Sequence, residues 1–118
     1  MHGKAELMAG LLLELRRGTV VLCVLAKLQR PAYGYNLVGD LAKDGVAVEA
    51  NTLYPLLRRL ESQGLLASAW NTDATKPRKY YATTVLGVEI LTELKGHWYS
   101  TVQSVNNILE DETICKTN

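Results

Sequence analysis

The stretch from residue 49 to residue 66, EANTLYPLLRRLESQGLL, restricts the possible folds of this chain more than any other part of it. Its leucines recur at the spacing of one helix face, and Gly64 follows them as a helix stop signal. Asn51 or Thr52 is expected to be the N-cap, which places Pro55 in or next to the first turn. There the missing N–H of proline costs little, because first-turn donors have no helical partner. The stretch therefore predicts a helix that begins close to Asn51 and buries its leucines.

Two further helices are expected before this stretch. Residues 5 to 29 leave few polar gaps, and they predict one helix that is buried on more than one side and that Pro31 stops. The motif YGY at residues 33 to 35 opens a second helix, which Gly45 ends. Only a short link separates this second helix from the third, so the two are expected to form a helix-turn-helix pair.

A β-hairpin and a long helix are expected after the stretch. Residues 65 to 70 and 78 to 83 alternate and contain aromatic side chains, and the polar turn between them predicts a hairpin with a basic tip. Thr84 caps a last helix that is expected to run to about Glu112. The apolar stripe of this helix consists of Val88, Leu91, Leu94, Trp98, Val102, Val105 and Leu109. The predicted fold class is mainly α with a small β-hairpin.

The charge of the chain is nearly balanced, but it is unevenly distributed. The chain has 118 residues, the size of one domain, and a formal net charge of +1. Five cations and two acids lie between residues 51 and 83, whereas one cation and five acids lie between residues 84 and 112. Any basic surface must therefore come from the middle of the chain.

Nothing in the sequence points to an enzyme, a cofactor or a metal site. Cys23 and Cys115 have no metal-ligand spacing and form no disulfide framework, which favours a reducing cytoplasm. His97 belongs to no metal motif, and Glu89 with Glu93 is an exposed i, i+4 pair rather than a catalytic dyad. No uninterrupted apolar run reaches the roughly 18 residues that a membrane-spanning helix needs.

The order helix, helix, helix, basic hairpin, long helix is that of a winged helix-turn-helix protein. In this arrangement the second helix of the pair enters the DNA major groove, which is about 12 Å wide. Asn51 and Thr52 then offer short polar side chains to base edges, and the cations beyond them reach phosphates. The expected DNA-binding residues are Tyr35, Asn51, Thr52, Tyr54, Pro55, Arg58, Arg59, Lys76, Arg78 and Lys79.

These interpretations have alternatives. Arg58 and Arg59 fit a solvated helix face as well as a phosphate contact, and Tyr54 fits the edge of the core as well as the DNA backbone. The small net charge also fits a winged-helix module that binds a protein and has no specific affinity for DNA.

Three motifs, YGYNL, NTLYPLLRRLESQGLL and RKYYATTVLG, occur in an order and spacing that resemble the PadR family of bacterial transcriptional regulators. The short final region resembles the small subfamily that includes the lactococcal multidrug-resistance regulator. The resemblance implies a homodimeric repressor of a partly palindromic operator, with a winged helix-turn-helix domain over residues 1–83, a dimerisation helix over 84–112 and a tail over 113–118. Thr83 departs from the pattern, which usually has an apolar residue there, and is expected to loosen the packing of the wing.

The apolar stripe of the last helix is too long for one small domain to bury, and it predicts a homodimer. In the multidrug-type members that the chain resembles, a tryptophan of the last helix lines a pore in which flat aromatic ligands stack, and Trp98 stands at the matching position. The alternative is that Trp98 belongs only to the dimer core. The first helix is expected to pack on the last one across the interface, which is expected to contain Leu12, Leu15, Leu91, Leu94, Trp98, Val102, Val105 and Leu109.

Overall fold

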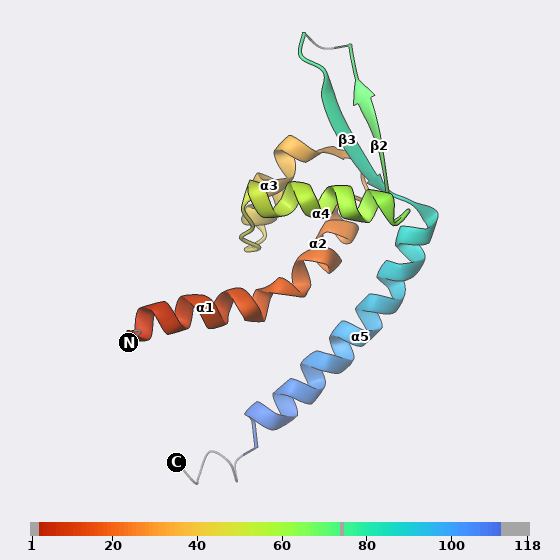
Figure 1. Cartoon of the computed structure of the whole chain (residues 1–118). Coiled ribbons are helices and arrows are strands. Elements are labelled where there is room, and N and C mark those ends of the chain that lie inside the picture. The colour runs from red at the N-terminus through yellow and green to blue at the C-terminus, as the bar shows by residue number, and fades with distance from the viewer. Residues whose placement is uncertain (1–2, 74, 112–118) are drawn as a thin grey trace.

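The computed structural model describes residues 3–73 and 75–111 of the chain. Its elements are α1 (Lys4–Arg17), α2 (Thr19–Lys27), β1 (Ala32–Tyr33), α3 (Gly34–Lys43), α4 (Ala50–Ser62), β2 (Leu66–Asn71), β3 (Arg78–Thr83) and α5 (Val85–Leu109). In Figure 1, α2, α3 and α4 form a small helical body, the β2–β3 hairpin projects from one side of it, and α1 and α5 leave it as two separate arms on the other. The predicted fold class, mainly helical with a small hairpin and a long last helix, is confirmed.

The hairpin belongs to a small antiparallel sheet with the strand order β1-β3-β2. The hairpin strands begin and end within one residue of the predicted bounds, with Trp70 opposite Lys79 in the register. The short strand β1 pairs Tyr33 with Tyr80 and was not predicted, because two residues are too few to show a periodic pattern. This strand ties the start of α3 to the middle of β3 and so to the wing, by which we mean residues 66–83.

The prediction of a single helix over residues 5 to 29 is wrong. Gly18 separates α1 from α2, and the Thr19 hydroxyl donates to the Arg16 carbonyl at 2.8 Å. Glycine weakens a helix interior, and a threonine side chain competes for backbone carbonyls, so the two together account for the break. The expected burial on several sides is also wrong for the first half, since α1 has no buried residue, whereas α2 buries Val24 and Leu25.

The predicted start of the third helix also needs correction. The N-cap of α4 is Glu49, whose carbonyl accepts the N–H groups of Thr52 and Leu53, so Asn51 and Thr52 lie in the first turn. Pro55 therefore lies inside the helix, where it removes the bond that the Asn51 carbonyl would otherwise accept. The expectation that Pro55 lies in or next to the first turn, where its missing N–H costs little, is therefore wrong. Asn51 and Pro55 are both exposed, so water can reach this side of the helix.

Among the residues that the structure describes, nine of the eleven buried core side chains are leucines, and six of these nine come from α2, α3 and α4. Leu53, Leu57 and Leu60 of α4 face inward at helical spacing, as predicted from the opening stretch. Gly45 and Gly64 have positive φ angles of 84° and 79° and follow the ends of α3 and α4, where only glycine adopts this conformation readily. The buried side chains are Val24, Leu25, Leu28, Leu37, Leu41, Leu53, Leu57, Leu60, Leu66, Tyr81 and Leu91.

The junction of the wing with α5 is tightly bonded. Thr84 is the N-cap of α5 as predicted, since its hydroxyl accepts the Gly87 N–H at 3.0 Å, and the same hydroxyl donates to the Gly64 carbonyl at 2.6 Å. The expectation that Thr83 loosens the wing is wrong. Its hydroxyl donates to the Leu25 carbonyl at 2.8 Å, which ties the end of β3 to α2.

The molecule is extended because of its two arms. Its radius of gyration is 17.9 Å, compared with about 13.5 Å for a compact domain of this length. On α5, Leu91 is buried against the body, but most of the apolar side chains beyond it are exposed. The helix ends at Leu109, and Glu112, where it was expected to end, lies outside the described residues. Within the described part of the chain, no helix combines the length and the apolar character needed to cross a membrane.

Candidate nucleic-acid interface

A groove runs between α4 and the wing. It has a volume of about 530 Å³, and its floor and walls come from the start of α3, the middle of α4 and the hairpin. Four of the residues that line it are lysine or arginine, and none of these lining residues is acidic. The complete lining is Gly34, Tyr35, Tyr54, Arg58, Trp70, Lys76, Pro77, Arg78, Lys79 and Tyr81.

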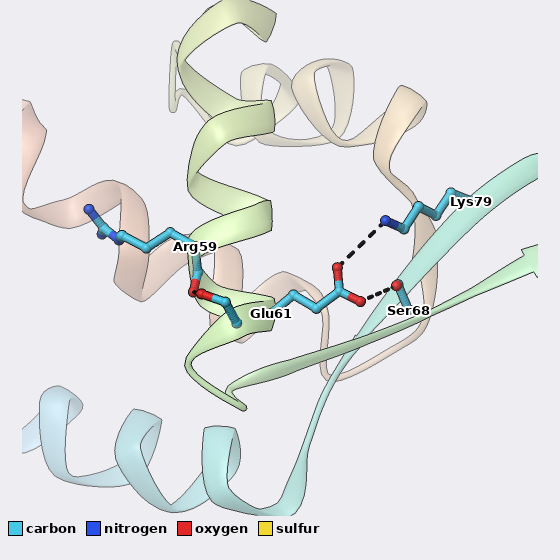
Figure 2. Close-up of polar contacts among 5 residues, drawn as sticks. Arg59, Glu61, Ser68 and Lys79 are labelled. Carbon is cyan, nitrogen blue, oxygen red and sulfur yellow. Dashed lines mark hydrogen bonds and ion pairs between the residues drawn. The ribbon is translucent and has the colours of Figure 1, made fainter.

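The groove brings together some of the predicted DNA-binding residues and separates others. Six of the ten line it, namely Tyr35, Tyr54, Arg58, Lys76, Arg78 and Lys79. Asn51, Thr52, Pro55 and Arg59 do not line it, but all four are exposed on α4. Figure 2 shows that Arg59 points away from the wing, whereas Glu61 two residues later points toward it. The two neighbouring arginines therefore face different directions.

Arg78, at the turn end of β3, is held by two aromatic rings. Its guanidinium carbon lies 5.6 Å from the ring centroid of Tyr33 and 5.3 Å from that of Tyr35. Tyr33 is fixed in turn, because its hydroxyl accepts a hydrogen bond of 2.7 Å from the Asn71 amide and its ring meets Tyr80 edge-on at 6.1 Å. From the sequence, Tyr33 was predicted only to open a helix. The alternation within RKYY, at the start of β3, was the available signal that Arg78 and a tyrosine share one sheet face.

Lys79 lies in a different environment from the other wing cations. Its ammonium nitrogen is 3.5 Å from a carboxylate oxygen of Glu61 and 5.3 Å from the ring centroid of the buried Tyr81. The other carboxylate oxygen of Glu61 accepts a hydrogen bond from the Ser68 hydroxyl (Figure 2). Lys76 and Arg78 are by contrast exposed. Glu61 and Ser68 were not among the predicted site residues, because nothing in the sequence places residue 61 beside residues 68 and 79.

Trp70 is a further residue of the groove that was not predicted from the sequence. Its side chain is 62% exposed, although it stands opposite Lys79 in the β2–β3 register and lines the same groove as four cations. An exposed tryptophan among cations is suited to contact a sugar or a base of a nucleic acid.

The chemistry of the remaining titratable groups does not indicate catalysis. Partial burial raises the pKa of the Cys23 thiol, with a smaller contribution from Asp44, and so keeps it protonated and weakly nucleophilic. Lys27 forms an ion pair with Asp44, which raises the lysine pKa. Among residues 3–73 and 75–111, no three His, Cys, Asp or Glu side chains are grouped to hold a metal ion.

A helix-turn-helix pair, a hairpin wing and a cationic groove between them define the class of winged-helix DNA-binding proteins. Comparison with known proteins agrees with this class. Residues 21–103 match the model of the "Transcriptional regulator PadR-like family". The transcriptional regulator Rv3488 of Mycobacterium tuberculosis is 36% identical over 81 residues, which cover 68% of this chain and 76% of that protein.

Solved structures give the same result. The fold is similar to that of a PadR family transcriptional regulator from Eggerthella lenta, with a TM-score of 0.85, 52% identity, and coverage of 91% of this chain and 96% of that one. A PadR-like transcriptional regulator from Bacillus cereus matches with a TM-score of 0.74, 32% identity, and coverage of 82% and 97%. The chain belongs to the PadR-like family of transcriptional regulators, and it is therefore a DNA-binding regulator and not an enzyme.

Proposed function

We propose that this chain is a cytoplasmic homodimeric repressor that binds a partly palindromic operator with α4 and the wing. The observation that carries the proposal is the groove between these two elements, which is lined by four cations and by no acidic residue among those that form it. When α4 lies in a major groove, the phosphodiester strand at its edge has to pass between α4 and the wing. Arg58 from one side and Lys76 and Arg78 from the other are placed to contact that strand.

The α4 residues outside the groove have a second role in this proposal. Asn51 and Thr52 lie in the first turn, and Pro55 follows on the exposed surface. Short polar side chains at this end of a recognition helix are suited to base edges in the major groove. Arg59, which points away from the wing, would reach the phosphates on the other side of the same groove.

The two arms support a dimer. Leu15 on α1 is 75% exposed, and Val105 and Leu109 on α5 are exposed as well. Apolar surface of this extent on a small chain marks an association site, and in a two-fold dimer α1 of one copy would cover α5 of the other. Leu91, an expected interface residue, is only 1% exposed in a single chain, so in this proposal it supports α5 from the core.

Trp98 is the candidate ligand-binding residue. Its side chain is 40% exposed on α5, between Leu94 and Val102 of the same apolar stripe. A pair of such rings at a two-fold axis would hold a flat aromatic molecule by offset stacking. Binding of that molecule would lower the affinity of the protein for DNA and so release the operator. Flat aromatic cations should then quench tryptophan fluorescence in the wild type and in Trp70→Phe, but not in Trp98→Ala. Equal quenching in both variants would show that the ligand binds away from Trp98.

The DNA-binding function is tested by fluorescence anisotropy with a labelled duplex from upstream of the chain's own gene, in excess unlabelled random DNA. The wild type should stay bound, and Arg58→Ala/Arg59→Ala should lose the duplex. The matched control is Arg16→Ala/Arg17→Ala, which removes the same charge from α1 and should bind nearly as well as the wild type. Displacement of the wild type by random DNA would contradict the proposal.

The net charge of +1 favours one alternative, a winged-helix module that binds a protein partner. Salt separates the two functions. A regulator with about six phosphate contacts should lose about a thousandfold in DNA affinity between 50 and 200 mM salt, whereas an interaction module should bind DNA weakly at both concentrations.

A further inference from the structure

The wing and α4 are joined by one carboxylate. Glu61, in the last turn of α4, bonds with one oxygen to Ser68 of β2 and with the other to Lys79 of β3 (Figure 2). Ser68 stands two residues before Trp70, the partner of Lys79 in the register, so both bonding groups lie on the same face of the hairpin. A single side chain of α4 thus contacts both strands of the wing.

The ion pair between Glu61 and Lys79 is partly shielded from solvent and packs against an aromatic ring. The side chains of Glu61 and Lys79 are 34% and 32% exposed, and the lysine nitrogen lies over the ring of the buried Tyr81. A partly shielded ion pair with both carboxylate oxygens bonded is stronger than a fully exposed one. Lys79 would lose the carboxylate and the ring together if it turned outward to a phosphate.

We propose that Glu61 is a positioning residue for DNA binding, which holds the wing at a fixed distance and angle from α4, and that Lys79 serves this clamp and not a phosphate. The proposal rests on the DNA-binding function proposed above. It also explains why an acidic side chain stands next to a cationic groove: its charge is matched by Lys79, while its geometry places Lys76 and Arg78 opposite Arg58.

The sign of one mutational effect separates this role from simple electrostatics. An acidic residue near DNA repels phosphates, so Glu61→Gln should strengthen binding if charge alone matters. If Glu61 positions the wing, the same substitution should weaken binding about tenfold. The reason is that the wing cations Lys76 and Arg78 would no longer be held opposite Arg58 of α4, so the three could not contact one strand together. The matched control is Glu49→Gln, which removes an acidic group from the other end of α4 without touching the wing and should bind as well as the wild type or more tightly.

A double-mutant cycle tests the role of Lys79. Under the proposal, Lys79→Gln weakens binding about as much as Glu61→Gln, and the double variant is no weaker than either single variant. The charge-swapped variant Glu61→Lys/Lys79→Glu should regain part of the lost affinity, which a residue needed only for folding would not allow. The melting temperature of each variant is measured alongside. If a single variant unfolds, the DNA affinity of the charge-swapped variant still tests the proposal.

The measurement is anisotropy with the duplex that the wild type binds. Tighter binding by Glu61→Gln, or independent effects of the two single substitutions, would overturn the clamp. The proposed function would still stand in that case, provided that the wild type binds the duplex specifically. Absence of specific binding by the wild type would instead overturn both.

Discussion

The guanidinium of Arg78 lies over the ring of Tyr35, with 5.3 Å between the guanidinium carbon and the ring centroid. The arginine comes from β3 and the tyrosine from the first turn of α3, so the contact joins the wing to the helix-turn-helix pair. Tyr35 is 70% exposed, and the stacked pair therefore stands at the surface beside the groove. An arginine that is already oriented loses less side-chain freedom when it binds a phosphate.

This contact predicts that Arg78→Lys weakens DNA binding about three- to tenfold although the charge is kept, because an ammonium group lacks the planar face that stacks. The slope of log affinity against log salt should stay as in the wild type. Arg78→Ala should in addition reduce that slope by about 0.9, the value for one lost phosphate contact. Equal affinity of Arg78→Lys and the wild type would show that the stacking has no part in binding.

Trp70 should report DNA binding directly. In a Trp98→Phe background, where Trp70 is the single tryptophan, addition of operator DNA should change the emission intensity and wavelength, because the ring lines the groove that we propose the DNA strand fills. The opposite variant, Trp70→Phe, leaves Trp98 on the α5 arm and should show little change. A larger response from Trp98 would mean that DNA does not occupy the groove.

The dimer proposal predicts that Leu15→Asp separates the copies without unfolding the chain. Leu15 is exposed in the single chain, so a carboxylate there is tolerated by the monomer, but it would be buried without a partner in the dimer. Sedimentation velocity should show a dimer for the wild type and a monomer for the variant at micromolar concentration. Leu91→Ala serves as the contrast, because loss of this buried side chain should lower stability by about 2–5 kcal/mol.

Two glycines of α5 should respond to alanine in opposite directions. A Cβ at Gly87 would lie 2.3 Å from the Leu65 carbonyl oxygen, so Gly87→Ala should push α5 away from the backbone that precedes β2 and lower the melting temperature. A Cβ at Gly96 would meet nothing within 4 Å, so Gly96→Ala should raise stability by about 0.5–1 kcal/mol through helix propensity. Stabilisation by Gly87→Ala would contradict the close packing of this junction.

The sequence predicted those parts of the fold that depend on local periodicity and on capping. The leucine spacing of α4, the Thr84 cap and the alternating strands of the wing each follow from neighbouring residues. The break at Gly18 was not predicted, because the apolar residues on both sides of this glycine continue the pattern of one helix. The strand β1 was not predicted, because it forms only through pairing with β3.

The candidate site was predictable in type but not in arrangement. Clustered cations and the motif around residues 51–59 indicated DNA binding. The contacts of Glu61 with Lys79 and Ser68 depend on which side chains the hairpin brings to α4, and that tertiary contact leaves no trace in local spacing. Arg58 and Arg59 look equivalent in sequence, yet only Arg58 lines the groove.

The most direct test of dimeric operator binding is selection of bound duplexes from a pool of randomised DNA by the wild-type protein at physiological salt. We expect an enriched motif with two inverted half-sites whose centres are about 10 bp apart or a multiple of that, as a two-fold dimer of winged helices requires. Enrichment should vanish for Arg58→Ala/Arg59→Ala. A pool that remains random after repeated rounds, or a motif without inverted symmetry, would contradict the account.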